Sequence, residues 1–181
     1  MKKLIVVFLF FFTFISSNAN EEYNHLDQLF IDLKTNNSTL TPDIEQKIWK
    51  IWSTHPTNQK LTILLGDGSK LVRDRQLSRA VEIFTEVISI DPLWAEAWNK
   101  RATVLYMLKD YTASQSDIEQ VLKLEERHFG ALAGQGLVNI KLENYEKAIE
   151  SYKKAKEIYP NMKSPDIMIK QIKELIKQQL I

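Results

Sequence analysis

Hydrophobic and small residues return to the same places in the chain after every 34 residues. Two columns hold small residues, namely Gly68, Ala102 and Gly136, and then Ala80, Ser114 and Ala148. Two further columns hold larger apolar residues and then smaller ones, namely Phe84, Ile118 and Tyr152, and then Val87, Val121 and Ala155. Each unit has room for two helices of about 13 residues joined by a short turn.

The small columns have a packing reason. Two helices approach each other closely only where the side chains between them are small. The bulkier column then fills the space beside that contact, and because one helix pair cannot bury its apolar face alone, neighbouring pairs must stack. The pattern therefore predicts an all-α solenoid of helical hairpins. Pro92 and Pro160, which close two of the units, argue against one long coiled coil.

Helical segments flank the repeats on both sides. In residues 20–58 the apolar stripe of Leu26, Leu29, Phe30 and Leu33 predicts one helix, and Thr41-Pro42-Asp43 starts a second. We interpret this pair as a divergent amino-terminal hairpin that covers one end of the stack. Residues 163–181 predict an amphipathic helix that caps the other end, with a membrane-surface or partner-binding helix as the alternative.

The repeats resemble the tetratricopeptide repeat over residues 61–162, divided into units 61–94, 95–128 and 129–162. The third unit matches best, with Gly136, Ala148-x3-Tyr152, Ala155 and Pro160. The second unit keeps Trp98 and Ala102 and departs at Arg101, Ser114, Ile118 and Glu126. The resemblance implies a right-handed superhelix of three repeats within the helical segments 59–162.

Residues 1–19 have the pattern of a secretory signal peptide. Lys2 and Lys3 precede an apolar run over residues 4–15, which is too short to span a bilayer, and Ser17-Asn18-Ala19 supplies a cleavage pattern. We expect cleavage after Ala19, no membrane span in the mature chain, and a bacterial periplasmic location. An uncleaved amino-terminal anchor is the alternative.

Composition narrows the classes of function. Removing residues 1–19 takes away two of the 24 basic residues and leaves all 23 acidic ones, so no basic stripe for nucleic acid remains. The chain has no cysteine, His25, His55 and His128 stand apart, and no nucleophile elbow is present. Gly66-Asp67-Gly68-Ser69-Lys70 lacks the Gly-Lys pair of a phosphate loop. We therefore predict no catalytic, cofactor or metal site, and no enzymatic activity.

The resemblance implies that the first helix of each pair lines a concave groove that binds peptides or helices of partner proteins. On this register the candidate partner-binding residues are Glu96, Asn99, Lys100, Thr103, Tyr106, Leu137 and Ile140. Some members of the family clamp a terminal carboxylate with lysines and asparagines, and here only Asn99 and Lys100 resemble that set, because Leu65 and Ser69 stand in the first unit.

These features predict a non-enzymatic scaffold or adaptor of the bacterial cell envelope that binds another protein in its groove. Two alternatives remain: a structural component that self-associates through its caps, and an accessory subunit or ligand carrier of an envelope enzyme.

Arg101 departs from the pattern of the family, which places an apolar residue at this position. We expect it to pair with Glu82, Glu86 or Asp117.

Overall fold

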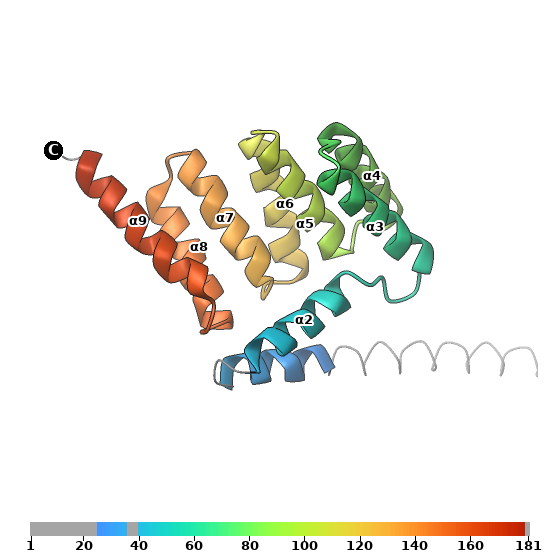
Figure 1. The fold of residues 1–181 in the computed structure, drawn as a ribbon, viewed down its shortest axis with the longest axis horizontal. Helices are drawn as coiled ribbons and strands as arrows, with labels where there is room; N and C mark the ends of the chain where they lie inside the picture. Colours follow the sequence, from blue (N-terminus) through green and yellow to red (C-terminus); the bar gives the residue numbers. More distant parts are fainter. Residues whose placement is uncertain (1–24, 36–39, 180–181) are drawn as a thin grey trace, which may run out of the picture. The chain divides into compact units, whose positions relative to one another are not determined.

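The computed structural model describes residues 25–35 and 40–179, and every regular element in these ranges is an α-helix (Figure 1). The chain divides into two compact units, the first ending at Ile51 and the second beginning at Trp52. Residues 1–19, with the predicted signal peptide, lie outside the described ranges, as does most of the polar stretch between the first two helices.

The first unit contains two helices, over residues 25–35 and in α2 (Thr41–Trp52), which continues one residue into the second unit. The predicted apolar stripe is buried in the first of them, at Leu26, Leu29, Phe30 and Leu33. Ile44 and Ile48 are buried in α2. The two predicted helices are therefore confirmed, and the role of this hairpin as a cap stays a prediction.

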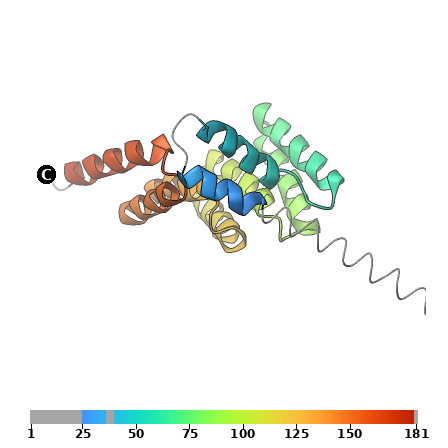
Figure 2. The ribbon, with the colours of Figure 1, turned by 90° about the horizontal axis from the view of Figure 1, so that it is seen from below.

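The second unit is a stack of helical hairpins followed by one more helix. Its members are α3 (Gln59–Arg73), α4 (Leu77–Ile90), α5 (Ala95–Met107), α6 (Tyr111–Leu124), α7 (Phe129–Lys141), α8 (Tyr145–Ile158) and α9 (Lys163–Gln179). Both views place α9 at one end of this stack and the α3–α4 pair at the other (Figure 1 and Figure 2). The arrangement confirms the predicted all-α solenoid.

The small and bulky columns meet inside the hairpins. A Cβ atom added at Gly68 would lie 2.5 Å from Phe84 Cε1, and one at Gly136 would lie 2.5 Å from the ring of Tyr152. Both aromatic rings are fully buried. In the middle hairpin the Ser114 hydroxyl donates a hydrogen bond to the carbonyl oxygen of Ala102, at 2.8 Å. The helices of each pair thus touch where the sequence places small residues, as predicted.

The turn inside each hairpin repeats a backbone feature that the sequence analysis did not predict. Arg75, Lys109 and Glu143 have φ values of 60°, 66° and 60°, and they stand 34 residues apart. In the first turn, Gln76 N–H donates to Leu71 O at 2.9 Å and Arg75 N–H donates to Val72 O at 3.1 Å. This pair of bonds is a Schellman motif, and it recurs in the other two turns.

The first helices of the pairs lie on the inner side of the stack. Contacts join α3 with α5, α5 with α7, and α7 with α9. No two second helices make comparable contacts in the described part of the chain. The stack is therefore tighter on the face formed by α3, α5 and α7, which we call the inner face, than on the outer face formed by α4, α6 and α8.

Candidate functional site

A small pocket of about 80 Å³ lies between α5 and α7, with α6 contributing part of its wall. Its lining residues are Asn99, Ala102, Thr103, Tyr106, Ser114, Ile118, Gly130, Ala131, Gly134, Leu137 and Val138. We call it the α5–α7 pocket. Four of the predicted partner-binding residues line it, namely Asn99, Thr103, Tyr106 and Leu137.

The other three predicted residues lie elsewhere. Glu96 is only 1% exposed, and the Lys100 ammonium lies 2.9 Å from its carboxylate oxygen Oε1. Ile140 packs against a core cluster that contains Tyr152 and Ile172. The structure therefore brings these three side chains into the interior or beside it, and not into the α5–α7 pocket.

Glu96 is the centre of a buried polar network between α5 and α7. Its oxygen Oε2 accepts a hydrogen bond from Asn99 Nδ2 at 2.9 Å and lies 3.1 Å from Nε2 of His128. His128 is fully buried and is the N-cap of α7, where its Nδ1 accepts a hydrogen bond from Ala131 N–H. Because Nδ1 accepts, Nε2 carries the proton and donates a hydrogen bond to the Glu96 carboxylate. The ring of Trp52 stacks on His128 with centroids 4.0 Å apart.

This network sets the charge state of Glu96. Burial alone raises the pKa of a carboxyl group, because it penalises the charged form. The hydrogen bond from His128 and the charge of Lys100 outweigh burial and hold the pKa of Glu96 below its ordinary value of 4.5. Glu96 is therefore a buried carboxylate that joins the start of α5 to the start of α7.

His55 makes the same kind of contact at the start of α3. Its Nδ1 accepts hydrogen bonds from the backbone N–H groups of Thr57 and Asn58, and its Nε2 lies 2.7 Å from Asp91 Oδ2. Sequence reasoning treated these histidines as isolated and missed both acid partners, which lie 36 and 32 residues away. The one feature of the sequence that could have indicated a structural role for His128 was its position directly before a helix. No cluster of three or more metal-ligating side chains occurs among the described residues.

Arg101 pairs with Asp117, one of its three predicted partners. The guanidinium donates two hydrogen bonds to the carboxylate, from Nε and from Nη2, each 2.8 Å long. It also lies over the ring of Trp98, 5.0 Å from the centroid. The bidentate geometry compensates the partial burial of the charge, so Arg101 joins α5 to α6.

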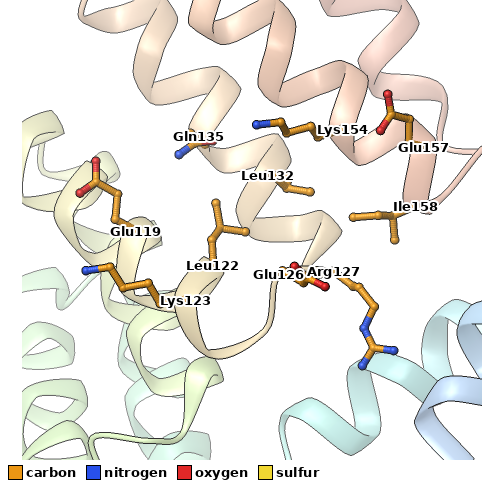
Figure 3. Close-up of a pocket in the computed structure, with 10 residues that line it drawn as sticks. All are labelled: Glu119, Leu122, Lys123, Glu126, Arg127, Leu132, Gln135, Lys154, Glu157 and Ile158. Atoms are coloured by element: carbon orange, nitrogen blue, oxygen red, sulfur yellow. The ribbon is translucent and has the colours of Figure 1, made fainter.

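A larger hollow of about 650 Å³ lies on the outer face, between α6 and α8 (Figure 3). It is lined by Glu119, Leu122, Lys123, Glu126, Arg127, Leu132, Gln135, Lys154, Glu157 and Ile158. We call it the outer furrow. The separation of the second helices explains it, and the sequence analysis did not predict it. Three apolar side chains lie among charged groups of both signs, so the furrow has no single electrostatic character.

Comparison with known proteins identifies the class of fold and then the family. Models of the tetratricopeptide repeat match residues 95–128 and 130–162. A TPR repeat-containing protein of Rhizobium etli is 35% identical over 117 residues, which cover 62% of this chain and 55% of that protein. The chain thus spans about half the length of that relative. The chain therefore contains tetratricopeptide repeats at residues 95–128 and 130–162.

Solved structures share the fold at lower identity. The first TPR domain of Spaghetti, solved with an HSP90 peptide SRMEEVD, has a TM-score of 0.64 and 22% identity, and it covers 66% of this chain and 94% of that one. A crystal structure of MamA has a TM-score of 0.60 and 19% identity, covering 90% of this chain and 80% of that one. At these identities the likeness concerns the fold alone.

Proposed function

We propose that this protein is a non-enzymatic interaction scaffold that holds an extended segment of a partner protein against the inner face of its helical stack. The observation that carries the proposal is the α5–α7 pocket, where four independently predicted residues meet on adjacent first helices. Two similar folds were solved with bound peptides, of HSP90 and of HSP70, which supports a peptide as the partner segment.

Binding would proceed by shape and hydrogen bonding, with no covalent step. The Thr103 hydroxyl donates to the carbonyl oxygen of Asn99, and the Asn99 amide donates to Glu96. Their oxygen atoms are the groups that remain to accept hydrogen bonds from a peptide backbone. Tyr106 and Leu137 supply apolar contact area beside these polar atoms.

The residues of the inner face do not suit a terminal carboxylate. Lys100 forms an ion pair with Glu96 and the Asn99 amide donates to the same carboxylate, so an acid of the protein itself already offsets the positive charge at this place. Ser69 donates its hydroxyl hydrogen to Leu65 O, and Leu65 itself is buried. We therefore propose that the partner segment is internal to its own chain and does not end at the groove.

The test is peptide binding by two matched variants. Leu137 in the pocket and Leu124 at the end of α6 are each 38% exposed, so Leu137→Glu and Leu124→Glu place the same charge at equally exposed sites. Peptides selected on the purified protein should lose at least about tenfold in affinity for Leu137→Glu. They should keep their affinity for Leu124→Glu. Equal binding by both variants would remove the inner face as the site.

We also propose that the protein acts in the bacterial cell envelope after cleavage behind Ala19. The apolar run over residues 4–15 supports export. In the described ranges no helix is both long and apolar enough to cross a membrane. The intact mass of the protein purified from its own host should lack residues 1–19, whereas a full-length mass would indicate an uncleaved anchor.

A further inference from the structure

Gly134 lines the α5–α7 pocket without being required by helix packing. A Cβ atom added there would lie 3.7 Å from Ile118 Cδ1, which is an ordinary van der Waals distance. In contrast, a Cβ at Gly68 or Gly136 would meet an aromatic ring at 2.5 Å. None of the described glycines has a positive φ. Neither close packing nor backbone conformation therefore demands glycine at position 134.

Glycine in the interior of a helix is nevertheless unfavourable relative to alanine. Gly130 and Gly134 stand four residues apart, so they occupy one face of α7, and both line the pocket. The missing side chain of Gly134 leaves open the space beside Ile118, which also lines the pocket. At position 134, then, the residue that is less favourable for the helix leaves space that belongs to the pocket.

The lining of the pocket defines the chemistry of what fits inside. None of its described lining residues carries a charge. The Ser114 and Thr103 hydroxyls donate to backbone carbonyls, and the Asn99 amide donates to Glu96. A charged side chain entering the pocket would lose its hydration without gaining an opposite charge, whereas an apolar side chain would gain from burial.

The volume of the pocket limits which apolar side chains can fit inside it. A cavity of about 150 Å³ accommodates a benzene ring. The α5–α7 pocket, at about 80 Å³, is roughly half that size. An aromatic ring is therefore too large, and a branched aliphatic side chain is the apolar group of suitable size.

We infer that the α5–α7 pocket receives a valine, isoleucine or leucine side chain from an extended internal segment of the partner protein, in the space kept open by Gly134. This inference rests on the proposed function, since it specifies which side chain the inner face selects. Lining contacts from Ile118, Leu137 and Val138 would surround the aliphatic group. The neutral lining matches an uncharged side chain.

The experiment begins with a displayed library of random decapeptides selected on the purified protein. Selected peptides should share a valine, isoleucine or leucine at one position. The tightest is then synthesised with its carboxyl end amidated. Replacing the shared residue by alanine, glutamate or phenylalanine should weaken binding at least about tenfold in each case.

Two glycine variants separate binding from stability. Gly134→Ala adds one methyl group to the pocket and favours the helix, so it should raise Tm by about 2–4 °C while weakening the selected peptide at least about fivefold. Gly66→Ala is the control, because a Cβ there has no atom within 4 Å. It should raise Tm similarly, and because Gly66 does not line the α5–α7 pocket, it should weaken the selected peptide less than Gly134→Ala does.

The outcomes distinguish the two proposals. If the selection yields no binding peptide, the proposed function fails and this inference fails with it. If peptides bind but share an acidic terminus or an aromatic residue, the inference is overturned and the scaffold function stands. Unchanged peptide affinity in Gly134→Ala would likewise overturn the inference alone.

Discussion

At the scale of single residues, glycine has two distinct roles in this chain. Gly68 lies against the buried ring of Phe84, whereas Gly66, two positions earlier in the same helix, has open space around it. The first is required by the packing of α3 on α4. Gly66 lowers the stability of helix α3, and its missing side chain permits no close contact with another residue.

Alanine substitutions should therefore act in opposite directions at these two positions. Gly68→Ala should lower the free energy of unfolding by about 1–3 kcal/mol, because the new methyl group forces the Phe84 ring to move. Gly66→Ala should raise it by up to about 1 kcal/mol through helix propensity. Urea unfolding followed by circular dichroism measures both. A stabilised Gly68→Ala variant would contradict the packing role of the small column.

Glu96 is the residue through which pH should act on stability. Its folded pKa is below the ordinary value of 4.5, so its contribution is fully present above that pH and is lost as the pH falls through the folded value. Glu96→Gln removes the charge that Lys100 and His128 stabilise. At pH 7 it should lower the free energy of unfolding by about 1–3 kcal/mol.

The difference between the wild-type protein and Glu96→Gln should then shrink as the pH falls below 4.5. Unfolding free energies measured from pH 7 to pH 3 check this. Glu150, whose pKa is lowered by a hydrogen bond from Lys154, titrates in both proteins and cancels in the comparison. A difference that stayed constant with pH would contradict the buried carboxylate.

At the scale of helices and turns, each hairpin uses a left-handed residue that is not glycine. Lys109 closes the turn between α5 and α6 with φ of 66°, and its side chain is exposed. A residue with a Cβ atom pays about 1–2 kcal/mol for this conformation. The hydrogen bonds of the Schellman motif hold it there.

Lys109→Gly should therefore raise the free energy of unfolding by about 1 kcal/mol. Lys153→Gly, at an exposed position inside α8, is the matched control and should lower it by about 1 kcal/mol. Thermal and urea unfolding of the two variants measure the effect. Destabilisation by both would mean that the left-handed turn is not populated in solution.

The sequence predicted the helical elements well, because their signals are local and periodic. The small column at Gly68 and Gly136 and the bulky column at Phe84 and Tyr152 meet as the spacing required. The partner of Arg101 was predicted as one of three acids, since only helix register limited the choice.

Other features could not be predicted, because they depend on distances between helices. The contact of Glu96 with His128 joins residues 32 positions apart, and nothing in the spacing of either residue indicates it. Glu96 was expected on the groove surface for the same reason. Helix register predicts the side of the helix on which a residue lies, whereas its burial depends on the neighbouring helix. The outer furrow arises from the separation of α6 and α8, which no single repeat encodes.

At the scale of the whole stack, the first helices contact one another more closely than the second helices do. Each face has its own hollow, and the two hollows differ in size and charge. The α5–α7 pocket on the inner face is small and uncharged. The outer furrow is larger and carries both signs of charge (Figure 3). We propose the inner face as the site of the partner, although the outer furrow offers more room.

Hydrogen–deuterium exchange of the purified protein, with and without a selected peptide, decides between these faces most directly. We expect bound peptide to slow exchange in α5 and α7, around Asn99–Tyr106 and Gly130–Val138, and to leave exchange unchanged in the parts of α6 and α8 that line the outer furrow. Protection confined to residues 119–127 and 154–158, which line the outer furrow, would contradict it.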